Sequence, residues 1–322
     1  MTRDDDTIEL RSGRPVIALD VGGSFIKTAV VARDGTVVRR ASYPTGHDGA
    51  EALADQLARI ADDARAHAVE APEAIGVLIP GLIDDERGVV ITATNLGLEN
   101  TPLRDMLTER TGLPVGFVND ARGGALSEFV LGAARTARNA LIVSIGTGIG
   151  AGVYLDGRAY DADGYGCEIG HMPTTLAPDV DAPVCICGGR SCLETFFSGA
   201  WIVRRYRRSH SADAAVTDAA QVFAAAATGD AAARAVLDQA IGALALAFAQ
   251  IATILAPETI VVAGGLSLAG DALFLPLRER LSGLLTFQRV PRVVPARFGD
   301  EAGVMGAALV ADSMLATRKI SV

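Results

Sequence analysis

The chain carries one local pattern twice, and this repetition constrains its fold more than any other feature. Residues 15–43 read as an apolar strand, a Gly-Gly turn, a second strand, a hairpin signal at Asp34-Gly35 and a third strand. Residues 139–160 repeat this plan, with a glycine-rich turn between two strands and Asp156-Gly157 at the next hairpin. A repeated pattern of this complexity indicates internal duplication. We therefore expect two related domains.

The remainder of the chain alternates between helical and strand patterns. Helical spacing or composition predicts helices over 49–69, 103–112, 121–132, 193–210, 215–256 and about 301–317. Short apolar runs predict strands over 74–80, 114–118 and 258–265. Gly112 is a stop signal for its helix, and Asp120 is placed to cap the helix that follows it. This alternation indicates α/β architecture.

Composition excludes several classes of protein. With 322 residues, half of them hydrophobic, the chain can bury a large core or two medium ones. No run of about twenty apolar residues lacks a charge, so we expect no membrane span. The net charge of −9 argues against a nucleic-acid surface, which leaves a small molecule or a protein partner. Residues 1–14 are polar and aperiodic and predict a flexible start that is too short for a DNA-binding module.

A window of unusual chemistry lies between residues 167 and 194. His171, Cys185, Cys187 and Cys192 supply one imidazole and three thiols, the ligand set of a closed structural zinc site. The alternative is a core histidine with buried thiols, but the cysteines cluster in a loop bounded by proline and glycine, where packing gives little reason for thiols. A disulfide is disfavoured because no secretory signal precedes the chain. Four protein ligands leave no position for an activated water, which excludes a zinc hydrolase.

Two carboxylates bracket this window. Glu168 lies three residues before His171, and Glu194 lies two residues after Cys192. An ordered loop would hold both at fixed places, and the second ring nitrogen of a ligating histidine also needs a partner. One economical arrangement directs all three groups at a polyhydroxylated ligand. The alternative is that both glutamates are ordinary surface charges.

The glycine turns of the two repeats suit phosphate groups. Asp20 precedes Gly22, Gly23 and Ser24, where backbone N–H groups can approach an anion, and Lys27 follows on the next strand. The Asp20 carboxylate could hold Mg²⁺, although a hairpin turn with a structural aspartate remains open. The second repeat has its turn at 146–150, which is neither a Walker loop nor a dinucleotide motif. Gly264-Gly265, at a strand end, would let adenine or ribose lie against bare backbone.

Taken in order, these motifs resemble the ROK family of sugar kinases and regulators. The resemblance runs from Asp20 to about Ala308 and rests on the motifs DVGGS, NDA, GTGIG, EIGH, CICGGRSCLE and AGG. Three positions depart from the family pattern: Ser24 stands for a threonine, and Cys167 and Ser191 stand for glycines. The stretch after Asn95 also lacks a tryptophan that is often found there.

The resemblance implies an actin-like ATPase fold of the ribonuclease H type, with two lobes and a cleft between them. The small lobe would span 15–119, completed by the C-terminal helix at about 304–322, and the large lobe 120–303. Sugar binding would fall to Asn95, Asn119, Asp120, Glu168, His171 and Glu194. The resemblance assigns phosphates and Mg²⁺ to Asp20, Gly22, Gly23, Ser24, Thr147 and Gly148. The residue patterns described above add Lys27, Gly264 and Gly265 as contacts for ATP.

The expected activity is ATP-dependent phosphorylation of a hexose, with glucose preferred and Asp120 as the general base. A carboxylate where a strand ends and a helix begins can accept the proton of the attacking hydroxyl. N-acetylmannosamine and N-acetylglucosamine are the alternative substrates. The rival from another class is a sugar-sensing regulator of the same family, and an actin-like filament protein would not explain the histidine and glutamates. We further expect a cytoplasmic homodimer or homotetramer.

Overall fold

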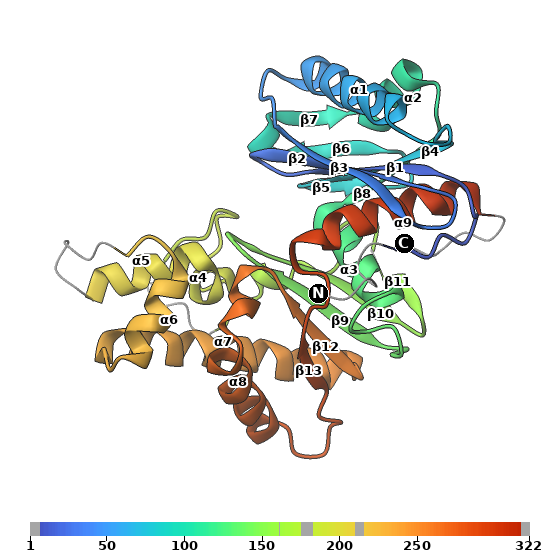
Figure 1. Cartoon of the computed structure of the whole chain (residues 1–322). Helices are drawn as coiled ribbons and strands as arrows, with labels where there is room; N and C mark the ends of the chain where they lie inside the picture. Colours follow the sequence, from blue (N-terminus) through green and yellow to red (C-terminus); the bar gives the residue numbers. More distant parts are fainter. Residues whose placement is uncertain (1–6, 161, 175–182, 210–215, 317–322) are drawn as a thin grey trace. The chain divides into compact units, whose positions relative to one another are not determined.

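The structure, a computed structural model, describes residues 7–160, 162–174, 183–209 and 216–316. The chain divides into two compact units (Figure 1). Unit 1 comprises Met1–Arg135, Arg158–Gly166 and Asp300–Val322, and unit 2 comprises Thr136–Gly157 and Cys167–Gly299. These limits differ from the expected lobes at 15–119 and 120–303, because the helix after residue 119 packs against the C-terminal helix inside unit 1.

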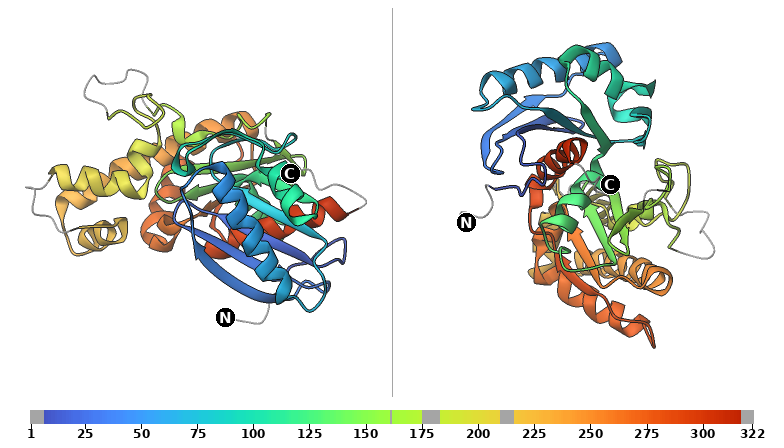
Figure 2. Two further views of the ribbon diagram at one scale, coloured as in Figure 1. Left: turned by 90° about the horizontal axis from the view of Figure 1, so that it is seen from above. Right: turned by 90° about the vertical axis from the view of Figure 1, so that its right-hand side faces the viewer.

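Unit 1 is built on a five-stranded sheet of order β3-β2-β1-β4-β8. Its strands are β1 (Val16–Val21), β2 (Phe25–Val31), β3 (Val37–Pro44), β4 (Ala74–Ile79) and β8 (Val115–Asn119). Helices α1 (Ala50–Ala66) and α2 (Leu103–Thr111) lie on one side of this sheet, whereas α9 (Ala302–Leu315) lies on the other side beside α3 (Asp120–Val130) (Figure 2). A separate three-stranded sheet contains β5 (Leu82–Asp84), β6 (Val89–Ala93) and β7 (Leu98–Thr101).

A second five-stranded sheet has the order β11-β10-β9-β12-β13. Its strands are β9 (Ala140–Ile145), β10 (Ile149–Leu155), β11 (Arg158–Tyr160), β12 (Thr259–Ala263) and β13 (Arg292–Pro295), of which all but β11 belong to unit 2. The helices of unit 2 are α4 (Glu194–Phe197), α5 (Gly199–Ser209), α6 (Ala219–Ala227), α7 (Ala231–Leu255) and α8 (Asp271–Leu284). The long helix α7 packs against α4, α5, α6 and α8 and supplies much of the apolar core of unit 2.

The predicted duplication is confirmed by the strand order. In each sheet, the first strand pairs antiparallel with the second and parallel with the strand on its other side, and a further parallel strand follows. Both glycine turns therefore connect equivalent strands, β1 to β2 and β9 to β10. The hairpin signals also hold, since Gly35 and Gly157 both have positive φ at the turns that they predicted.

Close backbone packing in unit 1 depends on glycine. A Cβ at Gly76 on β4 would lie 1.8 Å from the carbonyl oxygen of Ala307, and a Cβ at Gly306 would lie 2.0 Å from that of Gly123. Helix α9 can approach the sheet and α3 this closely only because these positions lack side chains. The start of α9 also lies beside the end of β1, because a Cβ at Gly303 would lie 2.2 Å from Asp20 Oδ2.

Several predictions need correction. The flexible start is wrong for residues 7–14, because Ile8 is fully buried and the N–H groups of Arg11 and Ser12 donate to the buried carboxylate of Asp312; residues 1–6 lie outside the described residues. The helix predicted at 193–210 is interrupted at Ser198. The helix predicted at 215–256 ends at Ala227, and α7 begins anew under the cap of Asp230. Sequence patterns missed α8, which contains Pro276, and the small sheet.

Helix α7 is long and apolar enough to cross a membrane by length and composition alone. Within its most apolar window, however, 61% of the residues are buried inside the fold. Its continuous apolar character is therefore that of a core helix, which packs on several sides at once.

Candidate functional site

The four predicted zinc ligands come together in unit 2. One ligand atom from each of His171, Cys185, Cys187 and Cys192 lies within 4.8 Å of the others. The Nδ1 atom of His171 is 3.6 Å from the Sγ atom of Cys185, and the Sγ atoms of Cys187 and Cys192 are also 3.6 Å apart. A tetrahedron with Zn–S bonds of 2.3 Å has edges of about 3.8 Å. The spacing and the donor set therefore fit one tetrahedral zinc ion.

A short hairpin presents these ligands. Cys185 exchanges backbone hydrogen bonds with Gly188 and Gly189, and a second pairing joins Pro173 to Cys192. A Cβ at Gly189 would lie 3.2 Å from the Cys192 sulfur and 3.3 Å from the Cys187 sulfur, so glycine keeps room for the thiols to converge. We call residues 168–174 and 183–194 the zinc knuckle.

The knuckle holds its thiols in unequal environments. Burial raises the pKa of the Cys185 thiol, and it raises the pKa of the Cys192 thiol to about 12. The backbone N–H of Gly189 lies 3.4 Å from the Cys187 sulfur and lowers the pKa of that thiol. Thiols with raised pKa values stay protonated at neutral pH unless a cation holds them as thiolates. A metal ion that binds here must therefore displace protons from Cys185 and Cys192.

The other ring nitrogen of His171 turns toward a carboxylate. Its Nε2 atom is 3.8 Å from the Glu168 carboxylate, and both side chains are accessible, at 32% and 59% of their full area. A ligating imidazole is oriented by the partner of its second nitrogen. His171 thus separates a metal face at Nδ1 from an exposed polar face at Nε2.

Glu194 links the zinc knuckle to the second glycine turn. Its Oε2 atom accepts the N–H of Ile149 at 3.1 Å, and its Oε1 atom lies 4.0 Å from the Cys185 sulfur. A Cβ at Gly148 would lie 2.7 Å from Oε2. The carboxylate therefore lies directly against the turn that contains Thr147. Sequence spacing did not reveal this contact, because 45 residues separate Glu194 from Ile149.

The first glycine turn lies in unit 1, next to Asp20. The N–H of Gly22 donates to the carbonyl oxygen of Phe25, and Thr45 braces the turn through bonds to Gly22 and Ser24. Gly23 has no atom near the place of a Cβ. The open side of the turn is therefore accessible to a ligand.

The carboxylate of Asp20 is partly buried against the start of α9. Burial raises its pKa to about 6, and Asp120 and Glu301 contribute to the increase, whereas Lys27 opposes it. A Cβ at Gly303 would lie 2.2 Å from Asp20 Oδ2. Lys27 pairs with Asp20 in the β1–β2 register, and its Nζ donates to the carbonyl oxygen of Asp300. A hard cation at this carboxylate would remove the cost of its burial, which fits Mg²⁺.

Asp120 is the first residue of α3, directly after β8. The prediction that Asp120 caps this helix is wrong: the cap is Asn119, whose Oδ1 accepts the N–H of Arg122 at 3.2 Å. The Nδ2 group of Asn119 donates to the carbonyl oxygen of Gly81. One oxygen of Asp120 accepts the N–H of Ala121 at 2.8 Å. Asn119 thus fixes the strand–helix junction from which Asp120 projects.

The remaining predicted residues are exposed or serve close packing. Asn95 is exposed in a single 3-10 turn (Thr94–Leu96) of unit 1. In unit 2, Gly264 has φ of 81°, and a Cβ there would lie 2.4 Å from the carbonyl oxygen of Ile145. Gly265 has no such neighbour. The end of β12 is therefore held against the end of β9, at the edge that carries the second glycine turn.

Two departures from the family pattern share one backbone feature. Cys167 has φ of 69° and Ser191 has φ of 59°, both in the left-handed region that favours glycine. The resemblance places glycines at these positions, and the backbone explains why. Side chains there add local strain directly before the knuckle and within it.

The comparisons agree with these motifs. The ROK family model matches residues 16–314. The glucokinase of Halalkalibacterium halodurans is 35% identical over 317 residues, covering 92% of this chain and 94% of the relative. The N-acetyl-D-glucosamine kinase of Escherichia coli O6:H1 is 30% identical over 302 residues, covering 90% and 97%.

Solved structures give the same result. The ROK hexokinase from Thermus thermophilus superposes with a TM-score of 0.81 at 34% identity, covering 92% of this chain and 97% of that one. The ROK glucokinase from Streptomyces griseus, in complex with glucose and AMPPNP, gives 0.76 at 27% identity, covering 92% and 99%. A ROK transcriptional regulator, a homolog of E. coli MLC, gives 0.83 at 26% identity, covering 94% of this chain and 78% of the regulator. With the family model matched over nearly its whole length, this chain belongs to the ROK family.

Proposed function

We propose that this protein is a glucokinase that transfers the terminal phosphoryl group of ATP to a hydroxyl of glucose. That it is a sugar kinase follows from relatives of this activity that match over nine-tenths of the chain. One observation carries the proposal: a single knuckle presents Glu168, the exposed nitrogen of His171 and Glu194. Carboxylates and an imidazole are suitable partners for the hydroxyls of a sugar.

Asp120 is the proposed general base. Phosphoryl transfer needs in-line positioning and a group that accepts the proton of the attacking hydroxyl. The Asp120 carboxylate takes that proton, and Asn119 keeps the junction rigid through its bonds to Arg122 and Gly81. General-base assistance of this kind contributes about 10²–10⁴ in rate. Asn95 and Asn119 are the further sugar contacts that we propose in unit 1.

The zinc knuckle has a structural function in this proposal. His171 Nδ1 and the sulfurs of Cys185, Cys187 and Cys192 hold the ion, which fixes the loop and takes no part in the reaction because its coordination is complete. Fixing the loop orients Glu168 and the His171 Nε2 atom. It also sets the position of Glu194 against the second glycine turn.

Both units contain residues that we propose for Mg²⁺ or ATP. In unit 1 the proposed residues are Asp20 for the cation and Gly22, Gly23, Ser24 and Lys27 for phosphate oxygens. In unit 2 they are Thr147 and Gly148 for phosphate and Gly264 and Gly265 for the nucleoside. Glycine turns let N–H groups approach phosphate closely, and Mg²⁺ prefers carboxylate oxygen.

Two alternative functions would differ from a glucokinase in the sugar that is bound or in whether it is phosphorylated. An N-acetylhexosamine kinase is supported by relatives at 30% identity and would need room for the acetamido group. A regulator is supported by the structural similarity, although the chain covers only 78% of the regulator that it resembles. A regulator would bind sugar and leave it unmodified.

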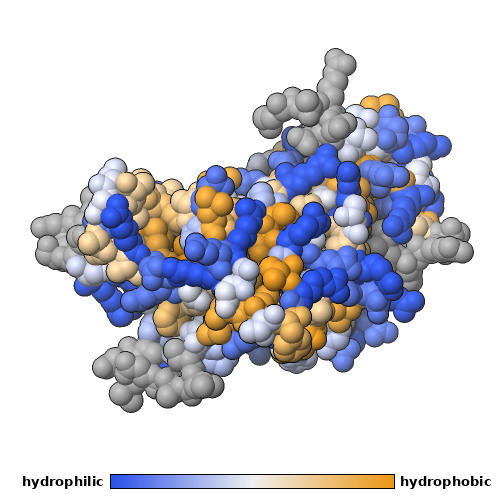
Figure 3. All heavy atoms as spheres, turned by 90° about the horizontal axis from the view of Figure 1, so that it is seen from below, coloured by the Kyte–Doolittle hydropathy of each residue, from blue (hydrophilic) through white to orange (hydrophobic). Residues whose placement is uncertain are grey.

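We further propose a cytoplasmic homodimer or homotetramer. Several large apolar side chains of unit 2 are exposed, among them Leu275, Leu284 and Phe287, with 57%, 48% and 89% of their area accessible. Figure 3 shows apolar atoms at the surface between hydrophilic side chains. Association would cover apolar area of this kind. Sedimentation velocity gives the assembly state directly.

The decisive test compares Asp120→Asn with the unaltered chain in a coupled ATPase assay over hexoses and N-acetylhexosamines. We expect turnover of glucose above all others, and a loss of at least about 100-fold in kcat for Asp120→Asn. The control is Asp105→Asn on α2, whose side chain is 75% exposed and which should retain full activity. Turnover by Asp120→Asn within about tenfold of the unaltered chain would exclude the base.

A further inference from the structure

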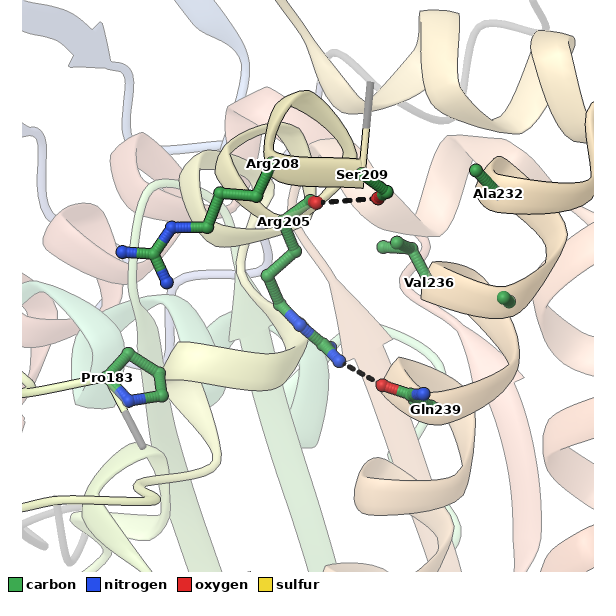
Figure 4. Close-up of a pocket in the computed structure, with 8 residues that line it drawn as sticks. Pro183, Arg205, Arg208, Ser209, Ala232, Val236 and Gln239 are labelled. Atoms are coloured by element: carbon green, nitrogen blue, oxygen red, sulfur yellow. Dashed lines mark hydrogen bonds between the residues drawn. The ribbon is translucent and has the colours of Figure 1, made fainter. Parts of the chain in front are cut away.

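A surface pocket of about 430 Å³ lies wholly within unit 2, between α5 and α7 (Figure 4). Arg205, Arg208 and Ser209 line it from the end of α5, Val236 and Gln239 line it from α7, and Pro183 closes one side. None of these residues belongs to the proposed catalytic or nucleotide-binding set. A volume of this size is typical of pockets for small molecules.

The guanidinium of Arg205 is only partly satisfied. Its Nη2 group donates to Gln239 Oε1, and its Cζ atom lies 4.9 Å from the centre of the Phe196 ring. Its Nη1 group is buried and has no hydrogen-bond partner in the part of the chain that the structure describes. Burial also lowers the pKa of this arginine. A buried donor without an acceptor costs about 1–3 kcal/mol, so an acceptor from a ligand would be favourable.

Arg208 adds a second cation at the same pocket. It is exposed, follows Arg205 by one helical turn, and pairs with no acidic side chain among the described residues. The other arginines of α5 have partners, since Arg204 lies over the ring of Trp201 at 4.6 Å and Arg207 donates to the carbonyl oxygen of Val216 at 2.8 Å. Of the arginines of α5, Arg205 and Arg208 are the two that line the pocket, and Arg205 has a buried Nη1 group without a hydrogen-bond partner among the described residues.

The acidic groups at the start of α7 and within it are engaged elsewhere. Asp230 caps α7 by accepting the N–H groups of Ala232 and Ala233, and Asp238 pairs with Arg280. Because the cap already uses the first N–H groups of α7, the helix end supplies little to an anion. The positive charge of the pocket comes from its two guanidinium groups.

We propose that this pocket binds the phosphate group of a small phosphorylated metabolite through Arg205 and Arg208. Arginine forks match phosphate oxygens, and a phosphate monoester has enough oxygens to engage two guanidinium groups together. Gln239 and Ser209 supply further polar contacts at the rim. The carbon skeleton of the metabolite packs against the apolar surface of Val236 and Pro183. Free phosphate has no carbon skeleton and lacks this contact, so the pocket should bind the ester more tightly.

The test is calorimetric titration of the full chain with glucose 6-phosphate and, separately, with inorganic phosphate. The protein is first saturated with glucose and AMPPNP, which fills the proposed catalytic site. Arg208→Ala and Arg205→Met should each weaken binding of the ester by about tenfold or more, since each removes a charged fork. Methionine still covers Phe196, so Arg205→Met keeps the packing of α5. Arg204→Ala, on the same helix outside the pocket, is the matched control and should leave the affinity unchanged.

The results distinguish a phosphate ester from inorganic phosphate as the ligand of this pocket. Tighter binding of the ester than of inorganic phosphate, lost in both pocket variants, supports the proposal. Equal affinity for the two probes would overturn the metabolite and leave a site for the free anion. Affinities that are the same in all variants, or no binding below about 10 mM, would overturn the pocket as an anion site. Failure of glucose or AMPPNP to bind would count against the proposed kinase function, and the comparison of variants would still be valid.

Discussion

The two glycine turns occupy equivalent places in two sheets of the same strand order, yet different chemistry braces them. The turn of unit 1 is fixed by the backbone and hydroxyl of Thr45, beside the partly buried carboxylate of Asp20. The turn of unit 2 is fixed by the Glu194 carboxylate, which belongs to the zinc knuckle. After duplication, the strands and turns kept a common geometry. The turn of unit 1 lies beside a partly buried carboxylate of its own first strand, whereas the turn of unit 2 is supported by a residue of the metal-binding knuckle.

This difference predicts that loss of zinc destabilises unit 2 far more than unit 1. Cys187→Ser should abolish zinc binding, lower the free energy of unfolding by more than about 3 kcal/mol, and raise the KM for sugar at least tenfold, because the knuckle loses its fixed shape. Metal analysis, thermal melting and steady-state kinetics measure the three effects. Cys167→Ser, at a cysteine outside the ligand set, should retain the metal. Zinc-free native protein, or full zinc content in Cys187→Ser, would contradict this view.

Glycine substitutions sharpen the comparison by disturbing one turn at a time. Gly303→Ala places a methyl group where Asp20 Oδ2 lies 2.2 Å away, so the carboxylate must move. We expect a loss of about 1–3 kcal/mol in stability and a rise in the KM for ATP of about tenfold or more. The KM for sugar should change much less.

The counterpart in unit 2 is Gly148→Ala, whose methyl group would lie 2.7 Å from Glu194 Oε2. Because Glu194 contacts both the turn and the knuckle, this variant should raise the KM for sugar and the KM for ATP together. Kinetics with each substrate varied in turn distinguish the two patterns. If both variants changed the KM for sugar and the KM for ATP in the same way, the two turns would have equivalent supports.

The sequence was sufficient to predict the elements that carry a strong local signal. Strands β1, β2, β9 and β10 have apolar runs that end at glycine-rich turns. The cysteines of the knuckle are recognisable because cysteine is rare in this chain and three of the four lie within eight residues. The small sheet β5-β6-β7 has short strands, and α8 carries Pro276, so periodicity is weak in both. Helix α7 was predicted as part of a longer helix because alanine continues across the break at Gly229.

Long-range contacts explain what the sequence could not show at the site. The bond from Ile149 to Glu194 and the contact of Asp20 with Gly303 join residues that only the tertiary fold brings together. Asp120 and Asn119 illustrate a local ambiguity, since either side chain can cap a helix. In the structure, Asn119 is the residue that caps α3. The sequence does not show which of two adjacent Asn and Asp residues is the cap, because a predicted helix boundary is uncertain by one or two residues.

The raised pKa of Asp20 predicts a pH dependence confined to unit 1. Its carboxylate has a pKa of about 6 when folded against 3.8 ordinarily, so its contribution to stability is complete below about pH 3.8 and is lost as the pH rises through 6. Relative to the unaltered chain, Asp20→Asn should therefore gain on the order of 2 kcal/mol between pH 4 and pH 7 without Mg²⁺. Melting in Mg²⁺-free buffer without chelator at both pH values measures this gain. Asp48→Asn, at an exposed position of the same unit, is the control, and an equal gain there would refute the assignment.

The smallest effect concerns the backbone directly before the zinc knuckle and within it. Cys167 and Ser191 adopt left-handed φ values of 69° and 59°, which cost an L-residue about 1 kcal/mol more than glycine. Cys167→Gly should therefore stabilise the protein by about 0.5–1 kcal/mol, after allowance for the greater freedom of glycine in the unfolded chain. Asn100→Gly in unit 1 is the matched control, since asparagine tolerates its left-handed φ of 44° and should gain less. Chemical denaturation resolves differences of this size, and equal gains at both positions would show that strain at Cys167 is no greater than strain at Asn100.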